Sequence, residues 1–180
     1  MESTRGQLLI AGPALLDPNF RRAVVLVIEH SADGALGLVL NRPSESSVAE
    51  AVPELEGVLD GESRLFVGGP VQPTSVIVLA RFEDPEEAAL LSFDDVGVLR
   101  AENSLDDPPD LVVGRGFAGH SGWGPGQLDA ELERGDWILE QARTEDAFSP
   151  DPERLWSDVL ARKGGSYALV ARMPLNPSLN

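Results

Sequence analysis

Hydrophobic residues in this chain fall mainly into short, unbroken runs that are separated by polar segments rich in proline and glycine. Runs of this kind, when they are rich in Val, Ile and Leu, predict strands that are covered on both faces. We predict strands at residues 8–11, 23–28, 35–40, 65–68, 75–80, 96–99, 111–113 with a continuation through 117, and, as a strand or turn, 136–139. The run at 167–170 predicts a last extended segment.

Helices are predicted in three places. Ser46 or Ser47 is a suitable N-cap for a short helix that Pro53 interrupts. Residues 125–133 have apolar positions on one face, as an amphipathic helix does. A third helix opens with an Asp-Pro pair and ends at two glycines, within residues 151–165, and its apolar residues recur at helical spacing.

The connection between the second and third predicted strands indicates how the strands pair. Asp33-Gly34 between two buried runs is a strong signal for a tight hairpin, and strands joined in this way are antiparallel. Regular crossover helices do not separate the predicted strands, so we expect an α+β fold with a mixed, largely antiparallel sheet. A length of 180 residues fits one domain, residues 1–180, with an extended tail over about 173–180.

The charge of the chain disfavours one class of function, the binding of nucleic acids. Fourteen basic residues stand against 30 acidic ones, for a net charge of −16, and such a field repels the phosphates of nucleic acids. The absence of cysteine excludes disulfide and thiol chemistry. The N-terminal residues lack a signal-peptide pattern, and no apolar run approaches the roughly 20 residues of a membrane span. We therefore expect a cytoplasmic protein without a membrane partner, for which direct nucleic-acid binding is disfavoured.

The glycine-rich stretch at residues 114–131 resembles several functional signatures. Its first six residues satisfy G-x-G-x-x-G, but a dinucleotide site requires a helix to start there, and residues 120–124 are a poor helix start. Ser121 lies in a partial G-x-S-x-G motif, but Trp123 replaces the last glycine and no histidine follows the serine. His30 and His120 lack metal-binding spacing. We expect neither a cofactor nor a metal.

Three groups of residues remain as candidates for chemistry. Glu29 and His30 are a possible acid/base pair. The hairpin geometry places the polar residues Asp17, Arg21, Asn41 and Arg42 at its other end, where they form either a small site or a brace for a chain crossing. The third group is a ligand or partner surface on two glycine-rich turns, with a helix start that can receive an anion: Gly68, Gly69, Trp123, Gly126 and Gln127.

The chain also carries a family resemblance. It contains, in order, Leu9-Ile10-Ala11 with Pro13, Asp17-Pro18, Phe20-Arg21, Glu29-His30, Gly34-Ala35-Leu36-Gly37, Asn41-Arg42-Pro43, Gly68-Gly69-Pro70-Val71, Gly119, Trp123, Gly126-Gln127-Leu128, Glu131, Trp137, Leu155-Trp156 and Pro177-Ser178-Leu179-Asn180. This pattern resembles the YqgE/AlgH family of small bacterial proteins, and the last two motifs resemble its actinobacterial branch. His120 departs from the pattern, because relatives usually carry Tyr there, and Gly114 and Gly116 lie outside it.

The resemblance implies a bifurcated sheet that is rolled toward a pseudo-barrel, with helices outside. The family's label is that of a transcriptional regulator, and no catalytic residues are established for it. Our leading hypothesis is a non-enzymatic regulatory module that binds a small ligand or a protein partner. The alternatives are an enzyme that uses Glu29 and His30 and, less compatible with the charge, a DNA-binding regulator.

Overall fold

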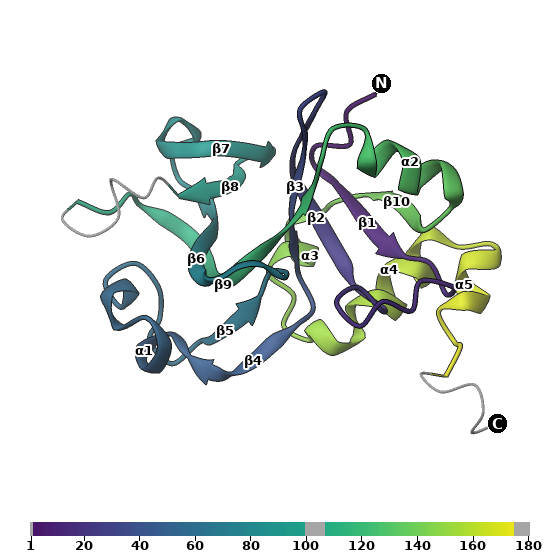
Figure 1. The fold of residues 1–180 in the computed structure, drawn as a ribbon. Helices are drawn as coiled ribbons and strands as arrows, with labels where there is room; N and C mark the ends of the chain where they lie inside the picture. Colours follow the sequence, from purple (N-terminus) through teal and green to yellow (C-terminus); the bar gives the residue numbers. More distant parts are fainter. Residues whose placement is uncertain (1, 100–106, 175–180) are drawn as a thin grey trace.

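The computed structural model describes residues 2–99 and 107–174, so the predicted tail at 173–180 lies outside the described residues except for its first two positions. Ten strands in the described part of the chain form one branched sheet (Figure 1). The strands are β1 (Gln7–Ala11), β2 (Val24–Ser31), β3 (Gly34–Val39), β4 (Pro43–Ser47), β5 (Arg64–Val67), β6 (Val71–Phe82), β7 (Ala88–Phe93), β8 (Val96–Leu99), β9 (Leu111–Trp123) and β10 (Trp137–Gln141).

The main path of the sheet runs in the order β10-β1-β2-β3-β9-β6-β8-β7, and every pair along it is antiparallel. The sheet branches at β9, which pairs with β6 along most of its length, with β5 in parallel near its middle, and with β3 at its end. The strand β4 joins this branch through β5. The predicted α+β fold with a mixed, largely antiparallel, bifurcated sheet is confirmed.

The sheet is rolled but not closed, and its two approaching parts are β2 and β7 (Figure 1). Side chains bridge this gap in place of a strand ladder. Ser92 Oγ in β7 donates a hydrogen bond to the carbonyl oxygen of Val27 in β2 at 2.8 Å. Nearby, Arg5 Nε donates to the carbonyl oxygen of Leu91 at 2.7 Å. The rolled strands therefore enclose a space between β2–β3 and β6–β8–β7.

Helices cover the outside of the sheet, and the predicted positions of three of them are confirmed to within a few residues. The α-helices are α1 (Val48–Ala51), α2 (Gln127–Arg134), α3 (Thr144–Ala147), α4 (Leu155–Lys163) and α5 (Ser166–Val170), with 3₁₀ turns η1 (Pro53–Leu55), η2 (Pro85–Glu87) and η4 (Pro152–Arg154). Ser47 caps α1, because its Oγ accepts a hydrogen bond from the backbone N–H of Glu50 at 3.2 Å. No helix in the described residues is long and apolar enough to cross a membrane.

The prediction of an extended segment at 167–170 is wrong, because these residues lie in α5. Side chains of α4 cover the edge strand β10: Lys163 Nζ donates to the carbonyl oxygen of Leu139 at 2.8 Å, and Arg162 Nη2 donates to that of Gln141 at 3.3 Å. A four-residue apolar run can form a strand or a helix, and here it packs as a helix against α4.

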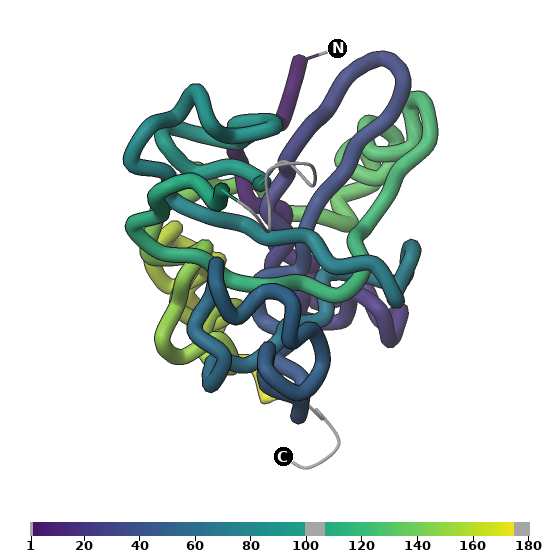
Figure 2. The backbone as a smooth tube through the Cα atoms, turned by 90° about the vertical axis from the view of Figure 1, so that its left-hand side faces the viewer, coloured from purple at the N-terminus to yellow at the C-terminus, as the bar shows by residue number. Residues whose placement is uncertain are grey.

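The hairpin between β2 and β3 forms as predicted, with its turn shifted by one residue. Ser31 pairs with Gly34, so Ala32 and Asp33 make the turn instead of Asp33 and Gly34. The hairpin projects at the same end of the molecule as α2 and the N-terminus, as both Figure 1 and Figure 2 show.

The core lies on both faces of β1 and β2, as their unbroken apolar runs predict. Leu8 and Ile10 of β1 face α4, in a cluster that includes Trp156. Leu9, one position along, faces the opposite side, in a cluster that includes Leu128 of α2. A third, smaller cluster packs α1 and η1 against β6 and β7.

Candidate functional site

The G-x-G-x-x-G stretch lies inside the strand β9, so it does not form the strand-to-helix turn of a dinucleotide site. Its last glycine has a packing role. Gly119 has a φ of +72°, and a Cβ there would lie 2.4 Å from the carbonyl oxygen of Gly69. A Cβ on Gly69 would in turn lie 2.3 Å from the carbonyl carbon of His120. The buried Ser121 donates from Oγ to the carbonyl oxygen of Gly68 at 3.2 Å, so its hydroxyl serves this same contact.

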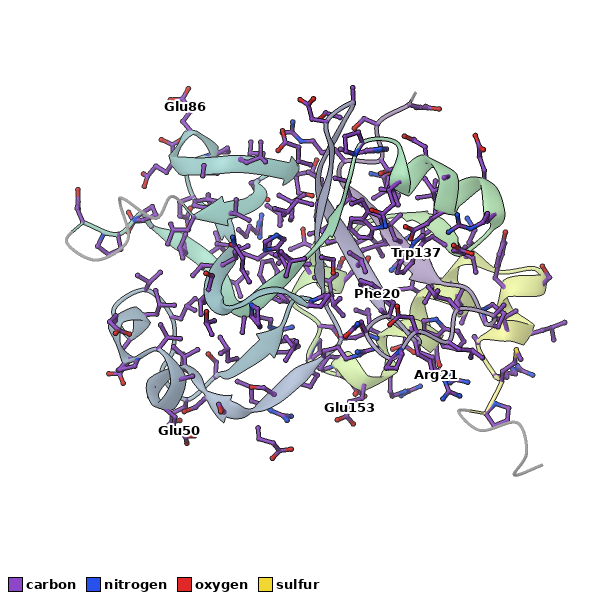
Figure 3. The ribbon with its side chains drawn as sticks, viewed as in Figure 1. Phe20, Arg21, Glu50, Glu86, Trp137 and Glu153 are labelled. Carbon is purple, nitrogen blue, oxygen red and sulfur yellow. The ribbon has the colours of Figure 1, made fainter. Side chains whose placement is uncertain are left out.

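Two residues of the predicted ligand surface, Trp123 and Gln127, are hydrogen-bonded to Glu131 of α2. The indole N–H groups of Trp123 and Trp137 both donate to Oε1 of Glu131, at 3.2 and 3.0 Å. Gln127 Nε2 donates to the second carboxylate oxygen of Glu131 at 3.0 Å. The three aromatic rings of Phe20, Trp123 and Trp137 contact one another, and Figure 3 shows Phe20 and Trp137 side by side. Trp123 and Gln127 are therefore held in a structural cluster.

The structure does not bring the five residues of the predicted ligand surface into one open patch. Gly68 and Gly69 are buried against β9, whereas Gly126 and Gln127 are exposed at the start of α2. Gly126 occupies the N-cap position in a left-handed conformation, and the Gln127 side chain accepts the backbone N–H of Gly124 at 3.0 Å. At the start of α2, the backbone N–H of Gly124 is thus bonded within the protein by the side chain of Gln127.

The polar cluster of Asp17, Arg21, Asn41 and Arg42 holds a turn against the end of the β2–β3 hairpin. Arg42 Nη2 donates to the carbonyl oxygen of Arg21 at 2.7 Å. Asn41 Oδ1 accepts the backbone N–H of Val24 at 3.0 Å, and the carbonyl of Asp17 accepts the N–H of Arg21 at 2.8 Å. These bonds reach main-chain atoms, so the cluster braces a chain crossing through hydrogen bonds. Partial burial lowers the pKa of Arg42 without removing its charge.

Glu29 and His30 do not share a cavity. His30 is buried, its Nδ1 accepts the backbone N–H of Thr4 at 3.1 Å, and its Nε2 lies 3.6 Å from Oδ1 of Asp129. Glu29 is exposed on the other face of the strand. His30 therefore fastens the N-terminal segment to β2, and the acid/base pair is not assembled. Among the described residues, no group of three His, Asp or Glu side chains is placed to hold a metal ion.

Glu29 instead lies at the mouth of an apolar cavity inside the rolled sheet. A bulge in β2 shifts the pairing with β3 between Val27 and Glu29. Ile28 is fully buried at this point, while the Glu29 side chain reaches solvent. The cavity has a volume of about 310 Å³ and is lined by Ile28, Glu29, Leu36, Leu55, Val76, Ile77, Val78, Leu90, Val98 and Leu99. Among the described residues of this lining, Glu29 is the one charged residue.

A shallower hollow of about 230 Å³ adjoins the cavity and shares Glu29 and Leu36 with it. The rest of its lining comes from the hairpin tip, including Asp33, and from Trp123 of β9. No described residue that lines either space is basic. The side chain of Glu29 makes no hydrogen bond or ion pair with the described part of the chain. The apolar cavity and this hollow, which we call the Glu29 site, together offer an apolar interior with carboxylates at its mouth.

Sequence reasoning identified Glu29 as a candidate but missed the cavity behind it. The lining residues come from β2, β3, β6, β7, β8 and η1, and most of them lie in apolar runs with the sequence pattern of ordinary core positions. No local motif marks a position where packing leaves space. The sequence signal that came nearest was a charged residue directly after the unbroken apolar run at 23–28.

The fold and the site together define a class of protein: a branched, rolled α+β sheet with helices outside and one apolar cavity that opens beside a carboxylate. Comparisons place the chain more narrowly. The family model described as AlgH-like matches residues 8–168, and the chain belongs to this family.

Relatives and solved structures agree with this assignment. A UPF0301 protein of Streptomyces coelicolor is 42% identical, with 100% of this chain and 97% of that protein covered. One of Thermobifida fusca is 41% identical over 99% and 96%. The crystal structure of a Corynebacterium diphtheriae protein superimposes with a TM-score of 0.83 at 29% identity, covering 95% and 93% of the chains. The solution structure of the AlgH protein from Pseudomonas aeruginosa gives 0.72 at 28% identity, covering 97% and 96%.

Proposed function

We propose that this protein is a non-enzymatic module that binds a small amphipathic cation at the Glu29 site. The observation that supports the proposal most directly is the apolar cavity of about 310 Å³ with Glu29 as its charged lining residue. This volume lies at the lower end of the range of about 300–1,000 Å³ that small-ligand pockets occupy. In a regulatory role, binding of the ligand would change how this protein contacts a protein partner.

The charges at the mouth favour a cationic head group. Glu29 and Asp33 both carry exposed carboxylates, and the described lining contains no basic residue to neutralise them. An ammonium or guanidinium group is attracted to this position, whereas a carboxylate or phosphate is repelled. The cavity walls favour an aliphatic or aromatic body attached to that head group.

The same geometry supports binding over catalysis. The acid/base pair that the sequence suggested needs both of its groups within hydrogen-bond reach of the reacting atoms. His30, the candidate partner of Glu29, is held by Thr4 and Asp129 on the other face of β2. The cavity lining supplies hydrophobic contact and one carboxylate, which is the composition of a binding pocket.

The expected affinity is modest. Burying about 150 Å² of apolar ligand surface is worth about 4 kcal/mol. The loss of translational and rotational freedom on binding offsets part of this gain, so we expect a dissociation constant of about 1 mM or weaker. An exposed ion pair adds a few-fold at most. A physiological ligand larger than a simple alkyl chain would bind more tightly, because it would bury more surface in the adjoining hollow as well.

The proposal is tested with hexylammonium, 1-hexanol and hexanoate, titrated while the side-chain methyl signals of Ile28, Leu36 and Ile77 are followed by NMR. We expect all three cavity signals to shift saturably with hexylammonium, less strongly with hexanol, and least with hexanoate. Glu29→Gln should remove the preference for the cation over the alcohol, whereas Glu86→Gln, a matched charge change at an exposed residue on η2, should keep it.

A cavity-filling variant completes the test. Val98→Phe places extra volume inside the cavity, so it should abolish the response to all three probes if the chain still folds. Methyl signals that do not respond to hexylammonium in the unmodified protein would overturn the proposal. So would equal binding of hexylammonium and hexanoate, because the carboxylate at the mouth would then have no role.

A further inference from the structure

A second polar feature lies on the strand branch, away from the Glu29 site. The guanidinium group of Arg115, on β9, lies over the ring of Phe66 with its Cζ 4.4 Å from the ring centroid. Its Nη2 donates to the carbonyl oxygen of Ser149 at 3.1 Å. Its Nη1 is buried and has no hydrogen-bond partner among the described residues. Buried donors are almost always satisfied in folded proteins, so this atom calls for an acceptor.

Within the described residues, Arg115 lacks the acidic partner that several other arginines of the chain have. Arg162, Arg81 and Arg134 each lie within 3.0 Å of an aspartate oxygen. In the described part of the chain, Arg115 has no carboxylate within ion-pair distance. Desolvation by burial lowers the pKa of Arg115, but an arginine keeps its charge under these conditions. The protein therefore holds a desolvated cation without a counter-charge.

A hollow of about 200 Å³ opens beside this group, lined by Pro43, Ser63, Arg64, Phe66, Arg115, Ser149, Pro150 and Pro152. We call it the Arg115 pocket. It is lined by two arginines and two serines, and no described acidic residue lines it. Arg64 uses Nε to donate to the carbonyl oxygen of Ser44 at 2.8 Å, and its side chain is otherwise exposed. Ser149 Oγ accepts the backbone N–H of Asp151, so its own hydroxyl hydrogen remains for another acceptor.

We propose that the Arg115 pocket binds a phosphate group, either as inorganic phosphate or as the phosphoryl group of a monoester. A tetrahedral oxyanion supplies a counter-charge for both arginines. It also offers an acceptor to the guanidinium of Arg115, whose Nη1 is closed to solvent here and would turn toward the pocket when the oxyanion binds. Planar guanidinium groups match the oxygens of phosphate with paired hydrogen bonds. The proline walls limit the size of the attached group. This pocket shares no lining residue with the Glu29 site, so each proposal stands or fails alone.

The test is a titration of the full chain with inorganic phosphate and, in a second arm, with O-phosphoserine, at constant ionic strength maintained with sodium chloride. Backbone amide signals at positions 64, 115 and 149 should shift saturably, while those of the Glu29 site should not. An inorganic phosphate ligand predicts equal or stronger binding in the first arm. A monoester ligand predicts at least tenfold tighter binding of O-phosphoserine.

Variants assign the effect to the arginines. Arg115→Met keeps an apolar stem over Phe66 and should weaken phosphate binding at least tenfold. Arg64→Gln, at an exposed position that does not threaten folding, should weaken it several-fold. Arg154→Gln makes the same charge change at an exposed ion pair with Asp158 and should alter affinity less than twofold. The proposal is overturned if neither ligand gives a saturable shift by about 50 mM, or if Arg64→Gln and Arg154→Gln respond alike.

Discussion

Glu131 shows how one residue can unite several motifs. Its carboxylate accepts hydrogen bonds from two tryptophans and from Gln127, which are spread over 15 positions of the sequence from 123 to 137. The sequence alone identifies these residues as family motifs. It suggests a ligand surface for Trp123 and Gln127 and no role for Glu131 and Trp137. The structure shows that they share one acceptor. This part of the family motif therefore has a structural role: the aromatic cluster and the carboxylate of Glu131 stabilise the fold.

Replacing Glu131 with alanine should lower the free energy of unfolding by about 2–3 kcal/mol, because two largely buried indole N–H groups lose a charged acceptor. Urea unfolding followed by tryptophan fluorescence measures this directly. Glu133→Ala changes the same residue type on the exposed face of α2 and should stay within about 0.5 kcal/mol of the unmodified protein. Equal effects of the two variants would mean that the shared carboxylate is not a stabilising centre.

At the scale of elements, the predictable parts of the fold were those with a strong local pattern. Unbroken apolar runs located β1, β2 and β3, and a serine with a following proline located α1. The strand β7 was missed because its sequence, Ala88-Ala89-Leu90-Leu91-Ser92-Phe93, has no β-branched residue and lies in an acidic, proline-containing region. The helix α5 was assigned wrongly because a short apolar run suits either a strand or a helix, and its packing against α4 decides between them.

The candidate site was less predictable than the fold for the same reason. Glu29 stood out in the sequence, but its partner in function was taken to be His30, its neighbour in the chain. Adjacent strand residues point to opposite faces, so sequence adjacency separates them in space. Neither the cavity beside Glu29 nor the pocket beside Arg115 has a local signal, because each is formed where distant elements fail to fill the space between them.

The short helix α3, which no local pattern predicted, depends on one buried ion pair. Asp146 is 3% exposed, accepts the backbone N–H of Arg143 at 2.9 Å, and binds Arg162 of α4 through both carboxylate oxygens, at 2.8 and 3.0 Å. The hydrogen bonds that Arg162 donates to Asp146 raise the pKa of Arg162, which indicates a favourable pairing of the charged forms. This pair fastens α3 to α4.

Asp146→Asn should therefore lower the free energy of unfolding by about 3 kcal/mol, since it leaves a partly buried arginine without its counter-charge. Asp158→Asn is the matched control, because Asp158 forms an exposed pair with Arg154 at 3.7 Å, and it should cost less than about 1 kcal/mol. Both values come from chemical denaturation. A cost for Asp146→Asn as small as that of the control would contradict the anchoring role.

At the scale of the whole molecule, the acidic charge is spread around the surface and is not confined to one patch. Glu50 on α1, Glu86 on η2 and Glu153 on η4 project from separate parts of the periphery (Figure 3). A distributed charge of −16 makes the surface repel other anions from most directions. The two arginines of the Arg115 pocket are a local exception to this field. Under our proposal they attract a single phosphate group, whereas the overall charge repels an extended phosphate backbone.

The same distributed charge predicts how stability depends on salt. Repulsion among surface carboxylates disfavours the compact state, and raising the ionic strength from about 0.01 M to 0.1 M shortens the screening length from about 30 Å to about 10 Å. We expect the melting temperature to rise by a few degrees over this range, as a gain of about 1 kcal/mol does for a chain of this size. Circular dichroism in a phosphate-free buffer measures the melting temperature without interference from the Arg115 pocket.

Sodium chloride and potassium chloride should raise the melting temperature alike if screening is the cause. A constant or falling melting temperature would contradict the prediction, and it would show that paired charges such as Arg162 and Asp146 outweigh the net repulsion.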